Sequence, residues 1–136
     1  MTVILGIDPG TNVTGYGIVK LEQSNLTYLH HEILKTGLKN LYTVKLSLIY
    51  DNTKRLIQLY QPDDIALESV FFSVNAGTAI KLGQARGAAL SACSGEQRNV
   101  YEYSPRRVKM IITGNGAADK TEVQKHVKKK LRLRRK

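Results

Sequence analysis

The sequence predicts an α/β fold: a mixed sheet of about five strands flanked by helices. Three observations predict it. Strand-forming runs separated by turn residues continue to Thr36, an apolar repeat of helical period follows over 41–60, and a further strand-like run occupies 63–68. A helix between two strands commonly joins parallel neighbours, so we expect the fourth strand to lie parallel to the first. The first three strands should be antiparallel.

The first strand is the apolar run from Val3 to Ile7, which ends in Asp8. Such a run is typical of a strand buried on both faces, and this predicts that Asp8 lies low in the fold with little water around it. Residues 9–12, Pro-Gly-Thr-Asn, form a strong turn, and Thr14 to Leu21 returns as the antiparallel partner. Three glycines leave room for a phosphate, a metal or another backbone beside the carboxylate: Gly10, Gly15 and Gly17. The alternative is a hairpin in which the aspartate only caps the turn.

The next two elements are a third strand, Leu26 to Thr36, and a long helix that starts near Leu41. Gly37 ends the strand, and Pro62 ends the helix after Gln61. One helix face is predicted to be apolar, while Lys45 and the other charged residues lie mostly on the opposite face. The apolar face consists of Leu46, Ile49, Thr53, Leu56, Ile57 and Tyr60.

The fourth strand, 63–68, ends in Glu68. A right-handed crossover places this strand beside the first, which brings Glu68 close to Asp8 at the same end of the sheet. Two neighbouring carboxylates repel each other unless a cation lies between them, and hard oxygen ligands suit Mg²⁺ or Mn²⁺. The alternative is that Glu68 faces solvent beyond the strand end.

Phe71 and Phe72 follow directly, and either core packing or stacking on bases explains such a pair. Asn75 then opens a helix that reaches Ala92 and carries a stripe of small residues on one side. Glycines inside this helix indicate that the sheet or a second subunit approaches closely; they are Gly77, Gly83 and Gly87.

The C-terminal part predicts a fifth strand, Asn99 to Tyr103, and two more helices. Ser104 is the expected N-cap of the first, with Pro105 at its first position. After a loop at 113–118, Asp119 and Glu122 form a capping pair for a last helix from Lys120 onward.

Size and charge limit the possible functions. A chain of 136 residues has room for one domain, and its net charge of +10 indicates a polyanionic partner. Eight of the 21 Lys and Arg residues lie between Lys125 and Lys136. This basic segment is either a DNA-binding tail or a solvated chain end, and the sequence allows both interpretations. Cys93 is a single cysteine in an apolar run, for which we expect a packing role. With no signal peptide or spanning helix expected, the predicted location is cytoplasmic, without membrane attachment.

Three motifs carry a family resemblance. Gly6-Ile-Asp-Pro-Gly-Thr with Thr14-Gly-Tyr-Gly, then Glu68-Ser-Val-Phe, then Leu82-Gly-Gln-Ala-Arg-Gly occur in this order and at these distances. Together they resemble the RuvC family, the bacterial Holliday-junction resolvases of the RNase H-like superfamily. The resemblance extends to about Val127, so we expect one RNase H-like resolvase domain over 1–127 and a basic tail off the family pattern over 128–136.

The resemblance implies a crossover junction endodeoxyribonuclease that nicks four-way DNA junctions in recombination and repair. It implies Asp8 and Glu68 as catalytic, metal-binding acids, with Mg²⁺ or alternatively Mn²⁺ as cofactor. Phe71 falls on the junction-stacking aromatic, while Lys109 and Lys120 fall on lysines near the DNA backbone. It further implies a homodimer built on the helix from Asn75, and a branch-migration motor complex as partner.

The chain departs from the family pattern where further catalytic acids are expected, since no Asp or Glu follows Glu122. Metal-dependent hydrolysis of this kind draws on three or four carboxylates. The expectation is therefore a shortened resolvase, and a junction-binding protein with impaired catalysis remains an alternative. A third alternative is a phosphate-binding domain of the actin-like ATPase or sugar-kinase type, which also starts with a Gly-Ile-Asp-x-Gly-Thr hairpin. A single domain of this size disfavours it.

Overall fold

The computed structural model describes residues 1–69, 75–94, 98–104, 106–107, 110 and 113–131. Its centre is a five-stranded mixed sheet in the order β3-β2-β1-β4-β5. The hairpin strands are β1 (Thr2–Asp8), β2 (Val13–Glu22) and β3 (Asn25–Lys35), and successive strands are antiparallel. β4 (Asp64–Glu68) and β5 (Asn99–Tyr103) continue the sheet in parallel with β1. The predicted strand directions are thus confirmed.

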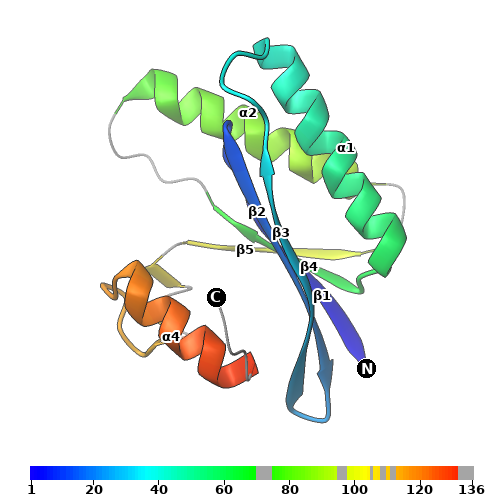
Figure 1. Ribbon diagram of the computed structural model, residues 1–136, viewed down its shortest axis with the longest axis vertical. Helices are drawn as coiled ribbons and strands as arrows, with labels where there is room; N and C mark the ends of the chain where they lie inside the picture. Colours follow the sequence, from blue (N-terminus) through cyan, green and yellow to red (C-terminus); the bar gives the residue numbers. More distant parts are fainter. Residues whose placement is uncertain (70–74, 95–97, 105, 108–109, 111–112, 132–136) are drawn as a thin grey trace.

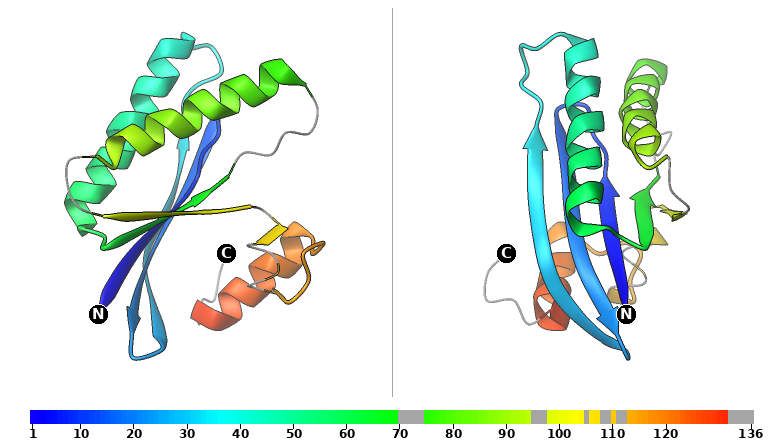
Figure 2. Two further views of the ribbon diagram at one scale, coloured as in Figure 1. Left: turned by 180° about the vertical axis from the view of Figure 1, so that it is seen from behind. Right: turned by 90° about the vertical axis from the view of Figure 1, so that its right-hand side faces the viewer.

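Helices lie on both faces of this sheet. α1 (Tyr42–Tyr60) and α2 (Ala76–Ala92) lie together on one face, and α4 (Lys120–Leu131) lies on the other (Figures 1 and 2). The N-caps expected from the sequence form: the side chains of Asn75, Ser104 and Asp119 accept hydrogen bonds from Thr78, Arg107 and Glu122 backbone N–H groups. At the C-terminus of α1, Gln61 takes the left-handed conformation with φ of 49° directly before Pro62.

The hydrophobic core lies between the sheet and the α1–α2 pair. Strand residues that alternate along β1, β2 and β4 meet apolar residues of both helices there; the cluster includes Leu5, Ile7, Tyr16, Ile18, Ile49, Leu56, Ile65, Leu67, Ala85 and Ala89. Cys93 joins this cluster, and burial raises the pKa of its thiol to about 11. Its predicted packing role is confirmed by this burial.

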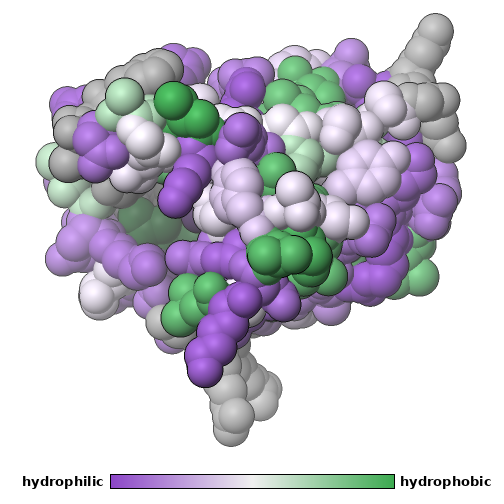
Figure 3. All heavy atoms as spheres, turned by 90° about the horizontal axis from the view of Figure 1, so that it is seen from above, coloured by the Kyte–Doolittle hydropathy of each residue, from purple (hydrophilic) through white to green (hydrophobic). Residues whose placement is uncertain are grey.

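The outer surface of the helical layer is only partly polar. Viewed toward the α1 and α2 end of the molecule, hydrophobic patches alternate with polar ones (Figure 3). Ile80 on α2 is 61% exposed. In the described part of the chain, a Cβ at Gly83 or Gly87 would meet no atom within 4 Å. The close approach that we expected at these glycines therefore does not come from the sheet.

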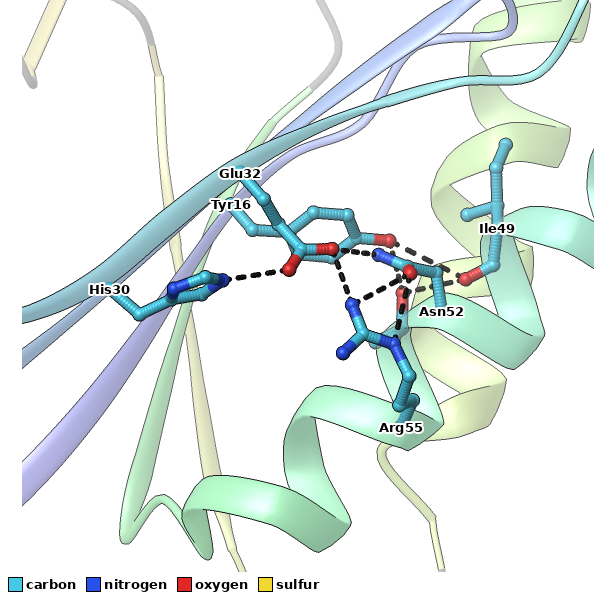
Figure 4. Close-up of polar contacts among 7 residues, drawn as sticks. Tyr16, His30, Glu32, Ile49, Asn52 and Arg55 are labelled. Atoms are coloured by element: carbon cyan, nitrogen blue, oxygen red, sulfur yellow. Dashed lines mark hydrogen bonds and ion pairs between the residues drawn. The ribbon is translucent and has the colours of Figure 1, made fainter.

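A polar network fastens the edge strand β3 to α1 (Figure 4). Glu32 Oε2 accepts hydrogen bonds from Arg55 Nη2 at 2.6 Å and Asn52 Nδ2 at 2.9 Å, while its Oε1 lies 2.7 Å from His30 Nε2. Burial alone would raise the pKa of Glu32, but the hydrogen bonds from these side chains and the Arg55 charge lower it to about 2. The network holds together a strand and a helix that are separated by a loop.

Two predictions about burial were wrong. Asp8 is exposed, because β1 buries only Leu5 and Ile7, while the alternate residues face the side of the sheet on which α4 lies. Lys45 is 8% exposed, although we placed it on the polar face of the helix. It lies four residues before the buried Ile49, so it occupies the same face as the apolar stripe.

Candidate active site

Asp8 and Glu68 line one cavity of about 510 Å³ on the face of the sheet opposite α1 and α2. Each is the last residue of its strand, and β1 and β4 are parallel neighbours with Ile7 opposite Leu67. The two strands therefore end at the same edge of the sheet, where open α/β folds place their sites. The structure thus brings together the two acids that the sequence singled out.

Small residues form the floor of this cavity. Gly6, Gly17 and Ala66 lie side by side on three neighbouring strands, and Gly15 lies opposite Asp8. A Cβ at Gly15 would lie 3.9 Å from the Asp8 Cβ. Because side chains are short or missing along these strands, a bulky chain such as a nucleic acid backbone has access to the carboxylates.

Residues from later in the chain complete the wall. Tyr103 at the end of β5 and Val127 of α4 also line the cavity. The backbone carbonyl of Tyr103 accepts a hydrogen bond of 2.8 Å from the Ser69 N–H, directly after Glu68. This contact fixes the end of β4 against β5.

An ion pair supports the same edge of the sheet from the other face. Arg86 of α2 pairs with Glu102 of β5. Arg86 belongs to the Leu-Gly-Gln-Ala-Arg-Gly motif, and Glu102 precedes Tyr103. The motif thus connects α2 to the strand that borders the cavity.

The turn after Asp8 is held by buried hydroxyl groups. The Thr14 hydroxyl donates to the Gly10 carbonyl at 2.9 Å and accepts from the Gly10 N–H at 3.3 Å. The Thr36 hydroxyl donates to the Thr11 carbonyl at 2.6 Å. A Cβ at Gly10 would collide with the Val13 carbonyl oxygen, so this glycine is required by a close backbone contact.

The donor set suits one divalent cation. Two carboxylates on an open cavity offer hard oxygen ligands, and water completes the shell that Mg²⁺ prefers. Glu68 also interacts with another group of the chain, so it is not a free ligand. Within the described ranges, no cluster of three or more His, Cys, Asp or Glu side chains is arranged to hold a metal.

Of the predicted DNA-contacting residues, only Lys120 can be placed. It is exposed at the first position of α4, the helix that contributes Val127 to the cavity. Phe71 and Lys109 lie outside the described residues. The basic tail beyond residue 131 also lies outside them.

Sequence reasoning missed several residues around the site: Thr14, Thr36, Lys45, Tyr103 and Val127. Two signals were available. Thr14 comes four residues after Gly10, where a hydroxyl commonly closes a turn, and Lys45 follows the period of the buried helix face. The approach of Tyr103 and Val127 to Asp8 depends on long-range packing, which no local pattern reports.

The comparisons with known proteins decide the family. The family model described as "Crossover junction endodeoxyribonuclease RuvC" matches residues 4–136. The chain belongs to the RuvC family. The match includes residues 128–136, which we expected to lie off the family pattern. It also removes the support for an actin-like or sugar-kinase domain.

Named relatives agree with this assignment. The RuvC of Sodalis glossinidius (strain morsitans) is 47% identical over 133 residues, which cover 98% of this chain and 76% of that protein. The RuvC of Pectobacterium atrosepticum is 45% identical over 133 residues, with 98% and 78% covered.

Solved RuvC structures have the same fold. The chain superposes on Thermus thermophilus RuvC with a TM-score of 0.86 at 32% identity, covering 97% of this chain and 81% of that one. T. thermophilus RuvC in complex with Holliday junction substrate gives a TM-score of 0.89 at 32% identity, covering 98% and 82%. The predicted RNase H-like fold of this RuvC-family chain is thus confirmed. No helix of its described part is long and apolar enough to cross a bilayer.

Proposed function

We propose that this chain acts on four-way DNA junctions as a metal-dependent crossover junction endodeoxyribonuclease. The observation that carries the proposal is the pair of carboxylates, Asp8 and Glu68, at one cavity of a RuvC-family fold. Membership of the family supplies the substrate class. The cavity supplies a place where that chemistry would occur.

Asp8 and Glu68 are proposed to hold Mg²⁺, with Mn²⁺ as a substitute, because both metals prefer carboxylate and water oxygens. When bound, the metal supplies a polarised water and offsets charge that develops on the phosphate. The two carboxylates would hold it at the strand ends, and the small residues Gly6, Gly17 and Ala66 on the floor would leave room for the phosphodiester.

Positive and aromatic side chains are proposed to bind the DNA itself. Lys120 is the exposed first residue of α4, and α4 lies on the side of the sheet that contains the cavity (Figure 1), so the ammonium group is available to a DNA phosphate. The resemblance of the Glu68-Ser-Val-Phe stretch assigns junction stacking to Phe71. Lys109 has the same proposed role as Lys120.

The proposed assembly is a homodimer through the outer face of α2. Ile80, Gly83 and Gly87 lie one helical turn apart on the side opposite the buried Ala85 and Ala89. A Cβ at either glycine would meet no atom of a neighbouring described element within 4 Å, so a second helix has room to approach. A cytoplasmic location and a branch-migration motor as partner, which the family resemblance implies, complete the proposal.

A second candidate is a junction-binding protein that does not cleave. The observation in its favour is the sparse metal site: in the described part of the chain, Asp8 and Glu68 are the only carboxylates that line the cavity, and no group of three or more His, Cys, Asp or Glu is arranged to hold a metal. Such a chain would keep its DNA contacts while the catalytic step lacks ligands.

A nicking assay separates the two candidates. The chain, purified away from host nucleases, is incubated with a labelled four-way junction and Mg²⁺, with Asp8→Asn as control. Nicking that requires Asp8 supports the nuclease. Binding without nicking, unchanged in Asp8→Asn, supports the second candidate, and failure to prefer the junction over linear duplex contradicts both.

A further inference from the structure

Among the buried side chains of the described residues, only Lys45 belongs to a charged residue type. The other buried polar residues there are threonines: Thr14, Thr36 and Thr53. Removing an ammonium group from water is costly unless its partners compensate. The Nζ of Lys45 donates a hydrogen bond of 2.6 Å to Asn12 Oδ1, the side chain of an exposed residue. A helix residue thus reaches into the turn that follows Asp8.

The same turn is held from two other elements. Thr14 at the start of β2 bonds both backbone groups of Gly10, and Thr36 after β3 bonds the carbonyls of Thr11 and Asn12 through its hydroxyl and its N–H. Three of the four buried polar residues therefore converge on residues 10–12. Stability alone does not explain this arrangement, because a well-packed apolar residue commonly replaces a buried charge without loss.

We infer that Lys45 is a positioning residue which, through Asn12, fixes the turn after Asp8 and thereby the direction of the Asp8 carboxylate toward a bound metal. Threonines tie the backbone of the turn, while Lys45 ties its tip to α1. Residues that orient a metal ligand change metal affinity even though they do not touch the metal. The inference rests on the proposed metal site.

The test uses variants of the full chain. Lys45→Met keeps the length of the side chain and removes the ammonium group. Asn12→Ala removes the acceptor at an exposed position and leaves the buried ammonium group without this partner, so its thermal unfolding is measured as well. Lys54→Met is the matched control on the same helix, since the Lys54 ammonium lies 5.6 Å from the Tyr50 ring centroid and bonds its hydroxyl.

The first measurement is Mn²⁺ binding by titration calorimetry. Lys45→Met and Asn12→Ala should each weaken binding about tenfold, the double variant should lose little more, and Lys54→Met should bind like the unmodified chain. Thermal unfolding of Lys45→Met should stay unchanged or shift upward. Unchanged Mn²⁺ affinity in a folded Lys45→Met or Asn12→Ala overturns the inference.

The second measurement needs no metal. Hydrogen exchange of the backbone amides of residues 11–13 should be faster in Lys45→Met and Asn12→Ala than in the control. If the unmodified chain binds Mn²⁺ no more tightly than Asp8→Asn does, the proposed metal site is wrong. The hydrogen-exchange rates alone then test whether Lys45 positions the turn. Equal exchange rates in all chains overturn the positioning role. If Lys45→Met does not fold, the exchange rates of Asn12→Ala provide the test.

Discussion

A single glycine shapes the turn that carries Asp8 into the site. Gly10→Ala places a methyl group against the Val13 carbonyl, and this contact is with backbone, which cannot swing aside. We expect the free energy of unfolding to fall by about 2 kcal/mol or more. Gly17→Ala is the matched control, because a Cβ there meets nothing within 4 Å, and it should change stability by under about 0.5 kcal/mol. Urea unfolding of both variants measures the difference, and equal losses would show that the turn adapts.

Glu32 gives a prediction about pH. Its pKa is about 2 in the folded chain against an ordinary value of 4.5, so the ionised group stabilises the fold above about pH 4.5. This contribution is lost as the pH falls toward 2. Glu32→Gln should therefore lower the free energy of unfolding by roughly 1 to 3 kcal/mol at pH 7. This range already allows for solvent screening of the ion pair, because Arg55 is half-exposed.

Urea unfolding over a pH series checks this prediction, because the difference between the two chains should close between about pH 4.5 and 2. Glu22→Gln serves as the control. Glu22 is exposed and lies 3.8 Å from Lys20, so its replacement should matter little at any pH. A difference for Glu32 that stays constant with pH would mean that packing, and not ionisation, stabilises this edge.

The residues that sequence reasoning placed correctly have local signals. Asn75, Ser104 and Asp119 each stand before a helix and cap it as expected. Lys45 and Asp8 were misjudged because their burial depends on distant partners. The ammonium group is accommodated by Asn12 across 33 positions of sequence, and Asp8 is exposed because it lies on the face of the sheet that contains the open cavity.

At the scale of elements, α2 has one face for the core and another without a partner in the described chain. Ile80→Asp should weaken self-association, because the change puts a charge into the proposed dimer interface beside Gly83 and Gly87. Leu59→Asp is matched in chemistry and exposure, since Leu59 of α1 is 63% exposed and Ile80 is 61% exposed. Sedimentation of the three chains over a concentration series measures the effect. Dimers that persist equally in both variants would place the interface elsewhere.

The elements themselves followed from the sequence with small shifts at their ends. β5 was expected over Asn99 to Tyr103 and is observed there, and α4 begins at Lys120 as the capping pair indicated. The spacing of apolar residues, together with turn and capping residues, indicates which residues form a helix or a strand. The right-handed crossover rule then placed β4 beside β1. The packing of α4 beside the cavity has no such rule, so the wall formed by Val127 could not be foreseen.

At the scale of the whole molecule, the sheet separates two tasks. Its α1–α2 face contains the core and the proposed dimer helix, whereas its other face contains the cavity, the two carboxylates and the start of α4. We therefore expect DNA that binds at the cavity to contact Lys120. Lys120→Ala should weaken binding to junction and linear duplex alike and reduce the salt slope by about one, as a phosphate contact does. Lys39→Ala is the control, because Lys39 is exposed and belongs to the loop before α1, a loop at the end of the molecule away from α4 (Figure 1).

Phe71→Ala should act differently, since stacking needs bases that are already unpaired. We expect a loss of roughly 1 to 3 kcal/mol in binding to a four-way junction, with little change for linear duplex and an unchanged salt slope, because a ring carries no charge. Binding of both DNAs at three salt concentrations, in parallel with Lys120→Ala, separates the two contributions. If Phe71→Ala weakens both DNAs equally and lowers thermal stability, the ring belongs to the protein interior, and the preference for junctions must come from the geometry of the dimer.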